Sequence, residues 1–265
     1  MKASLPNPKN SAFLPTSQKE VAALGWDSID IILFSGDAYV DHPAFGTAMI
    51  ARVLQAEGFK VAVVPQPNWR DDLRDFKKLG KPRLFFAVSA GAMDSMVNHY
   101  TANLRLRSND AYTPGGKAGF RPDRTVKTYT QILKRLYPHV PVVVGGIEAS
   151  LRRLTHYDYW SDRLMPSILV DSKADILVYG MGEKQIVEIA KAIDRCAEDG
   201  RSLRLKMEDC CAEDIPQVAY LTNKLRGERQ EAIVLQSHEA AVKSKQVHAE
   251  NFRLIETESN KIHAA

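Results

Sequence analysis

The chain has 265 residues, of which 26% are charged and 45% are hydrophobic, with a formal net charge of +4. This length allows one large α/β domain with or without an extension, and the mild charge permits an anionic partner without requiring one. No stretch of about 18 apolar residues occurs and the first residues lack the apolar core of a signal peptide, so the sequence argues against a membrane or secreted protein and predicts a cytoplasmic one.

The start of the chain predicts an arm followed by a strand. Residues 1–26 are polar and rich in proline and end in a short predicted helix over 17–24, so we expect an N-terminal arm with little chemistry of its own. The run of β-branched and aliphatic residues over 29–34 is too short for a helix and apolar on both faces. It therefore predicts a strand buried within a parallel sheet.

The first strand is followed by a helix and a second strand. Asp41 or His42 can cap the free amides of a helix whose first turn tolerates Pro43, and Gly58 ends that helix. Residues 61–64 are again continuously apolar. Two strands joined by one helix of this length predict a right-handed parallel βαβ unit, whose ligands lie beyond the carboxyl ends of the strands.

The same alternation continues to about residue 200. Further strands are predicted over 83–88, 141–144 and 175–179, and further helices over 71–79, 93–101, 125–137 and 184–197. Strands that alternate with helices in this way predict an α/β fold, with a doubly wound, mainly parallel five-stranded sheet over 27–200. We expect a flavodoxin-like or cobalamin-binding-like strand order, 2-1-3-4-5.

The end of the chain, 201–265, predicts a connector and a C-terminal helical extension. One more strand is possible within 202–221, and strong helix formers over 228–256 predict one long helix. Apolar residues recur every seven positions, at Ile233, Ala240, Val247 and Leu254. Because the positions that would complete a heptad are polar, we expect this helix to pack on another element, with a coiled coil as the alternative.

Small and polar residues collect where the predicted strands end. Amides bared by glycine suit a polar ligand group, so we predict a ligand-binding rim, although glycine also serves sharp turns. The rim residues are Ser35, Gly36, Asp37, Asp41, His42, Ser89, Gly91, Gly145, Gly146, Glu148, Gly180 and Gly182. His42 is either a ligand or acid–base group, or a helix cap or packed side chain.

The usual catalytic and phosphate-binding motifs are absent from the sequence. Neither Gly-x-Gly-x-x-Gly after the first strand nor Gly-x-x-x-x-Gly-Lys-Ser/Thr occurs, which disfavours ordinary dinucleotide and NTP binding. Gly-x-Ser-x-Gly is also missing, so no nucleophilic triad is indicated. We therefore assign no catalytic residue and no metal ligand.

A basic segment with aromatic neighbours interrupts the pattern over 104–124. It has many turn residues and no period, which predicts a long functional loop. With the residues near 150–160 it could form a surface for RNA or another anion, the alternative being a solvated face. The proposed anion-binding residues are Arg105, Arg107, Arg121, Arg152 and Arg153, with Tyr112, Phe120, Tyr157, Tyr159 and Trp160 nearby.

Four long strings of residues resemble the N-terminal region of YgiQ-type radical SAM proteins. They are FLPTSQKEVAALGWDSIDIILFSGDAYVDHPAFGTAMIARVLQAEGFKVAVVPQPNW, SNDAYTPGGKAGFRPDR, VGGIEASLRRLTHYDYWSD and DILVYGMGEKQI. The resemblance implies a Rossmann-like domain of cobalamin-binding type that precedes a radical SAM barrel. In that barrel, Cys-x-x-x-Cys-x-x-Cys holds a [4Fe-4S] cluster whose open iron binds S-adenosylmethionine.

This sequence departs from that pattern in its cysteines. Cys196, Cys210 and Cys211 do not have the required spacing, nor that of a disulfide framework, and are expected to be reduced thiols. The resemblance thus implies an N-terminal domain or truncated form, not catalytic alone, whose partner is the missing barrel in the same polypeptide. The substrate is unknown, and an RNA- or nucleotide-like anion-binding module is the alternative.

The cobalamin comparison is partial. Domains that bind cobalamin carry the motifs Asp-x-His-x-x-Gly, Ser-x-Leu and Gly-Gly after three of their strands. At the corresponding positions this chain has the similar residues Asp41-His42, Ser89-Ala90-Gly91 and Gly145-Gly146. The histidine comes one residue early and Gly91 replaces the leucine. The resemblance therefore implies the architecture, whereas cobalamin is not expected to bind, and a cobalamin-binding accessory domain is kept as an alternative.

Overall fold

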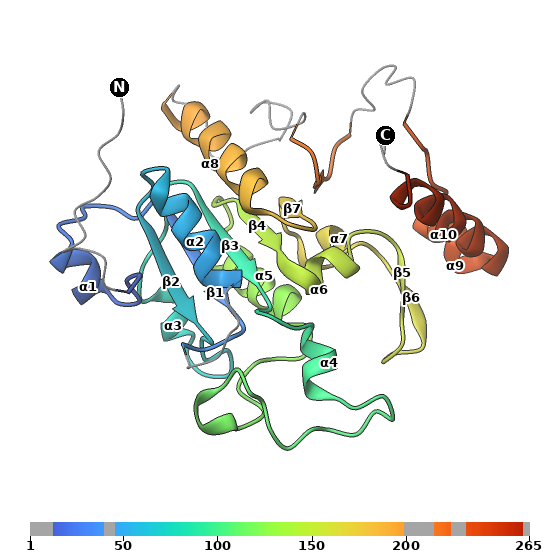
Figure 1. The fold of residues 1–265 in the computed structure, drawn as a ribbon, viewed down its shortest axis with the longest axis horizontal. Coiled ribbons are helices and arrows are strands. Elements are labelled where there is room, and N and C mark those ends of the chain that lie inside the picture. Colours follow the sequence, from blue (N-terminus) through green and yellow to red (C-terminus); the bar gives the residue numbers. More distant parts are fainter. Residues whose placement is uncertain (1–12, 40–45, 199–214, 224–231, 262–265) are drawn as a thin grey trace.

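A six-stranded sheet forms the centre of the protein in a computed structural model, which describes residues 13–39, 46–198, 215–223 and 232–261 (Figure 1). The strand order is β2-β1-β3-β4-β7-β8. The strands are β1 (Ile31–Ser35), β2 (Val61–Pro65), β3 (Phe85–Ser89), β4 (Val142–Gly145), β7 (Ile176–Val178) and β8 (Val218–Tyr220). The first five are parallel, which confirms the predicted fold and its 2-1-3-4-5 order, and β8 adds an antiparallel edge strand.

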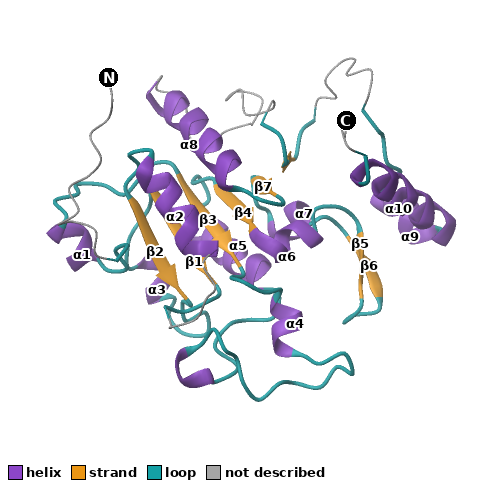
Figure 2. Cartoon of the chain, viewed as in Figure 1, coloured by secondary structure: helices purple, strands orange, loops and turns teal. Residues whose placement is uncertain are grey.

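Helices cover both faces of the sheet (Figure 2). On one face, α2 (Gly46–Ala56) lies beside α8 (Glu183–Glu198), and both pack on the strands. On the other face, α3 (Arg74–Lys77), α5 (Thr125–Leu136) and α7 (Ile168–Ser172) pack on the sheet. Because both faces are covered, the strands read as continuous apolar runs, which is why they could be predicted.

Aromatic side chains fill much of the core beneath α3 and α5. Phe34 stacks on Phe76 with ring centroids 5.2 Å apart, and Phe76 meets the ring of Tyr129 edge-on at 5.4 Å. All three side chains are buried. Aromatic pairs of this kind contribute about 0.5–1.5 kcal/mol beyond the burial of their area, so this cluster fixes α3 and α5 on the sheet.

The chain between β3 and α5 is irregular, as predicted. After α4 (Ser95–His99) it forms two isolated β-bridges and one 3₁₀ turn at Pro114–Gly116. Between α6 (Gly146–Leu151) and α7, a hairpin of β5 (His156–Asp158) and β6 (Arg163–Met165) projects from the sheet. Its three-residue strands carry no alternation that would have predicted them.

The C-terminal prediction of one helix over 228–256 is wrong. In the described part, α9 (His238–Lys243) and α10 (Lys245–Ser259) are separate helices that pack on each other. Ser244 divides them, because its extended backbone breaks α9 and its Oγ accepts a hydrogen bond from the Val247 N–H at the start of α10. The seven-residue series therefore spans several segments and does not lie on one continuous helix over 232–261.

Two smaller features complete the fold. The arm contains α1 (Gln18–Ala23), whose N-cap is Ser17, and this agrees with the short helix predicted over 17–24. The α9–α10 pair meets the rest of the molecule where His238 Nδ1 lies 3.2 Å from Thr155 Oγ1. Within the described ranges, none of the helices combines the length and the apolar character that a bilayer crossing requires.

Candidate functional site

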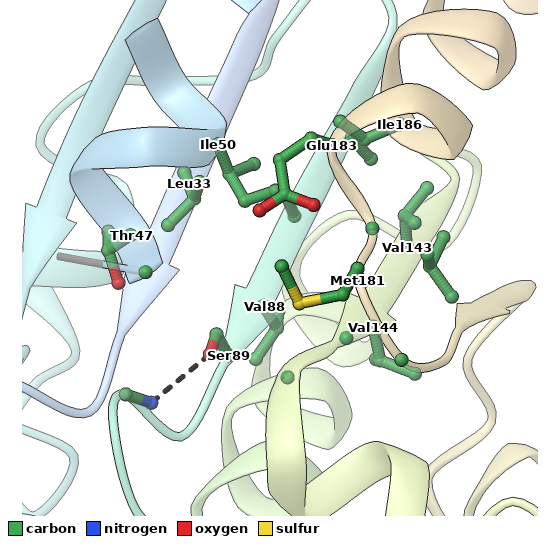
Figure 3. Close-up of a pocket in the computed structure, with 18 residues that line it drawn as sticks. Leu33, Thr47, Ile50, Val88, Ser89, Val143, Val144, Met181, Glu183 and Ile186 are labelled. Carbon is green, nitrogen blue, oxygen red and sulfur yellow. Dashed lines mark hydrogen bonds between the residues drawn. The ribbon is translucent and has the colours of Figure 1, made fainter. Parts of the chain in front are cut away.

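A cavity of about 180 Å³ opens at the carboxyl ends of β1, β3, β4 and β7, between α2 and α8 (Figure 3). This is the edge at which open parallel sheets place their ligands. Its lining residues are Leu33, Gly46, Thr47, Ile50, Ala87, Val88, Ser89, Gly91, Val143, Val144, Gly145, Gly146, Val178, Gly180, Met181, Gly182, Glu183 and Ile186. The cavity therefore lies at the edge of the sheet where the sequence predicts a binding site.

The cavity has an apolar interior and a polar mouth. Valine and isoleucine side chains from the strands and from α2 and α8 form its walls. At the mouth, the side chains of Met181 and Glu183 turn inward from the loop before α8 and from its first residue (Figure 3). Thr47 and Ser89 provide hydroxyl groups on the opposite side. Such a site suits a ligand with an apolar body and one polar end.

Two glycines keep the cavity open because they have no side chain. Gly146 has φ = +81°, and a Cβ atom there would lie 2.7 Å from Ser89 Oγ. A Cβ atom on Gly182 would lie 2.9 Å from Val178 Cγ1. Any larger residue at these positions would push side chains of the cavity wall, and Gly146 also needs a backbone conformation that other residues adopt at a cost.

The structure brings half of the predicted rim residues together at this cavity. These lining residues are Ser89, Gly91, Gly145, Gly146, Gly180 and Gly182. Ser35 and Gly36 are buried beside it, where Ser35 Oγ accepts a hydrogen bond from Thr47 Oγ1 at 3.1 Å. Asp41 and His42 lie outside the described residues. Ligand binding by this rim stays a prediction.

Asp37 lies outside the lining of the cavity and joins two loops. Its carboxylate accepts a hydrogen bond from the Ala92 N–H at 2.7 Å and pairs with Arg121 at 3.0 Å. Burial raises the pKa of Asp37, and the charge of Arg121 opposes that rise. This side chain therefore ties the segment after β1 to the segment after β3, and ligand binding by Asp37 stays a prediction.

Arg121 does not belong to an exposed basic surface, and its assignment to one is wrong. The side chain is fully buried and pairs with both Asp37 and Asp110, each at 3.0 Å. It also donates a hydrogen bond to the Ala90 carbonyl oxygen at 3.0 Å. The sequence shows a basic residue in a polar loop, but two buried carboxylates neutralise it, so it anchors the 104–124 segment against the sheet.

The remaining anion-binding residues do not form one continuous surface. Arg152 is only 12% exposed and pairs with Asp94, so its assignment is also wrong. Arg153 donates to the Ser150 carbonyl oxygen and stacks over Tyr179. Arg105 and Arg107 are exposed. RNA binding by these two exposed arginines and their aromatic neighbours stays a prediction.

Glu148 is a structural residue, which corrects its assignment to the rim. It is completely buried in α6, and its carboxylate accepts hydrogen bonds from Ser95 N–H at 3.1 Å, Ser95 Oγ and Val126 N–H at 2.8 Å. Burial is the main cause that raises its pKa. One carboxylate thus satisfies free amides at the start of both α4 and α5.

The sequence analysis missed the polar residues of the mouth. Thr47, Met181 and Glu183 were not predicted, although Met181 directly follows Gly180 and Glu183 directly follows Gly182 at a strand end. The signal was available, because any residue in that turn must lie near the binding edge.

The residues of this chain do not fit an iron–sulfur cluster. Within the described ranges, no three His, Cys, Asp or Glu side chains gather as metal ligands, and Cys196 is buried in α8. The full sequence also lacks Cys-x-x-x-Cys-x-x-Cys. No chemistry through such a cluster can be assigned to these residues.

Comparisons with known proteins give one family. The model described as "Radical SAM N-terminal" matches residues 13–265. Two curated relatives are each named "UPF0313 protein". The one from Bacteroides thetaiotaomicron is 59% identical over 96% of this chain, and the one from Porphyromonas gingivalis is 58% identical over 95%. The chain spans 41% and 38% of their lengths, about two fifths.

A solved structure gives a weaker match. The radical S-adenosylmethionine methyltransferase TsrM from Kitasatospora setae, determined with cobalamin and a [4Fe-4S] cluster bound, aligns with a TM-score of 0.46 and 20% identity. The alignment covers 74% of this chain and 29% of that chain. This likeness is too distant to assign any site in the present molecule.

Proposed function

Because this chain belongs to the radical SAM N-terminal family, we propose that it is the ligand-binding domain of a radical SAM protein. In this proposal it holds part of a substrate or cofactor at the strand-end cavity. A radical SAM barrel in the same polypeptide supplies the [4Fe-4S] cluster and S-adenosylmethionine. In this proposal the domain does not act alone, because the full sequence lacks the Cys-x-x-x-Cys-x-x-Cys that holds the cluster.

The observation that carries this proposal is the cavity itself. At about 180 Å³ it is larger than the packing voids of ordinary protein interiors. In another protein, an apolar cavity of about 150 Å³ binds benzene, so this one has room for an aromatic ring. Its walls come from four parallel strands and two long helices, which makes it a preformed site and not a gap between loops.

Exposed apolar side chains on α6 and in the loop before α8 support a barrel as the partner. Ile147, Leu151 and Met181 are 44%, 58% and 76% exposed, and all three belong to α6 or to the loop before α8. Large apolar residues grouped near a binding site mark contact surfaces. The curated relatives are more than twice as long as this chain, which leaves ample length for a second domain.

Blocking the mouth tests the proposed function. Indole, which has an apolar bicyclic body, is expected to bind, and Met181→Trp is expected to weaken that binding at least about tenfold, equivalent to about 1.4 kcal/mol. Met181 is exposed, so the substitution should not disturb folding. The measurement is isothermal titration calorimetry on the wild-type protein and the variant.

Met49→Trp is the matched control for this experiment. Met49 is 49% exposed on α2 and does not line the cavity, so indole affinity should be unchanged. If indole fails to bind the wild-type protein, or binds both variants equally, the cavity is not a ligand site and the proposed function is lost.

A further inference from the structure

We infer that the strand-end cavity selects a ligand whose polar end is cationic or donates hydrogen bonds, and rejects one that ends in a carboxylate or phosphate. This inference deepens the proposed function and rests on it. It names the class of ligand from the charge at the mouth of the cavity, which the glycine pattern alone does not reveal.

Glu183 is the charged residue of the cavity lining. No Lys, Arg or His occurs among the lining residues in the described part of the chain. The Glu183 carboxylate points into the cavity, between Ile50 and Met181 (Figure 3). Among the residues that the structure describes, no hydrogen bond or ion pair engages this carboxylate, whereas the next residue, Lys184, pairs with Glu188 at 3.7 Å.

One of the two hydroxyl groups at the mouth already has its proton committed. Thr47 Oγ1 donates its proton to Ser35 Oγ at 3.1 Å. Ser89 Oγ accepts a hydrogen bond from the Gly91 N–H, also at 3.1 Å. Among the described residues, the mouth therefore presents one carboxylate without a partner, and the Ser89 hydroxyl can still donate or accept. A ligand that brings its own N–H or O–H groups can bond both oxygens, whereas an acceptor can bond only Ser89.

Charge decides between ligand classes more strongly here than at an open surface. Glu183 is partly buried against the apolar walls, and attraction or repulsion between charges strengthens as the local dielectric constant falls. An anionic ligand end would be held close to the Glu183 carboxylate, and both would lose hydration. A cationic end would instead form a charge-assisted hydrogen bond with it.

A simpler role for Glu183 must be separated from this one. It is the first residue of α8, where a negative side chain stabilises the helix through the helix dipole. That role affects folding stability and predicts no preference among ligands of one shape, so ligand selectivity distinguishes the two roles.

Three planar probes of nearly equal size provide the test. Benzamidine is cationic, benzamide is neutral with N–H donors, and benzoate is anionic. Calorimetric titration of the wild-type protein should show benzamidine binding about tenfold more tightly than benzamide, and benzoate about tenfold more weakly than benzamide. Glu183→Gln should remove the advantage of benzamidine and improve benzoate binding, so that the three affinities agree within about threefold.

Glu188→Gln is the matched control, because it removes one negative charge from the same helix away from the cavity. It should keep the wild-type order of the three probes. A circular dichroism spectrum and a urea midpoint like those of the wild-type protein show that Glu183→Gln is still folded. If the three probes bind wild-type protein alike, if none of them binds, or if Glu183→Gln keeps the wild-type order, the inference is wrong. If indole binds in those cases, the proposed function survives, and if indole also fails, both are lost.

Discussion

Replacing Arg121 by methionine is expected to lower the free energy of unfolding by about 3–5 kcal/mol, the usual consequence of removing one partner from a buried ion pair. The guanidinium is fully buried between Asp37 and Asp110, at 3.0 Å from each. Methionine fills a similar volume but leaves two carboxylates without their counter-charge. Urea denaturation followed by circular dichroism measures the loss.

The pH dependence of this variant provides a second signature. Burial already raises the pKa of Asp37, and Arg121 restrains that rise, so the variant should raise it further. A carboxyl group whose pKa is higher in the folded state than in the unfolded state takes up a proton on folding. The variant should therefore regain stability as the pH falls towards that pKa, and its deficit should be smaller at pH 5 than at pH 8.

Arg105→Met is the control for the Arg121 prediction. Arg105 lies in the same loop region but is exposed, and its loss should leave the denaturation midpoint nearly unchanged. A loss of less than 1 kcal/mol in Arg121→Met, or equal losses in both variants, would show that the buried ion pair does not anchor this segment.

Glu148→Ala is expected to lower the free energy of unfolding by about 3 kcal/mol, because hydrogen bonds to charged groups are strong and buried donors without acceptors are unfavourable. The substitution leaves the Ser95 and Val126 N–H groups unsatisfied at the starts of α4 and α5. It also opens a small cavity under α6, which adds to the loss. Thermal and urea denaturation of the variant measure the effect.

Two further variants locate the origin of that effect. Glu148→Gln keeps the shape and one acceptor oxygen, so it should recover part of the stability lost in Glu148→Ala. Glu188→Ala changes a partly exposed glutamate on α8 and should alter stability little. Should Glu148→Ala prove as stable as the wild-type protein, the carboxylate would not be what holds these two helix starts together.

The central sheet could be predicted because its strands are buried on both faces. Runs such as 31–34 and 61–64 are continuously apolar, and only a covered parallel sheet accommodates them. The β5–β6 hairpin could not be predicted in this way, and β8 lies within 202–221, where the sequence allowed one more strand without placing it. Each strand has three residues, and its pairing depends on tertiary position and not on a local pattern.

The sequence could predict which edge of the sheet holds the cavity, but not which side chains line its mouth. Gly145, Gly146 and Gly180 mark strand ends whatever surrounds them, and they line the cavity. Arg121 and Glu148 were misassigned because a sequence shows a charge but not the partner that buries it. The same limitation hid Glu183, whose importance comes from its orientation towards the cavity.

The most direct test of the strand-end cavity as the ligand site is an amide-resolved NMR titration of isotope-labelled protein with indole. The account predicts saturable shifts that are largest at Gly145, Gly146, Gly180, Gly182 and Glu183, with little change in α9 and α10. Shifts centred on the 104–124 segment or on α9 and α10, or shifts that never saturate, would contradict it.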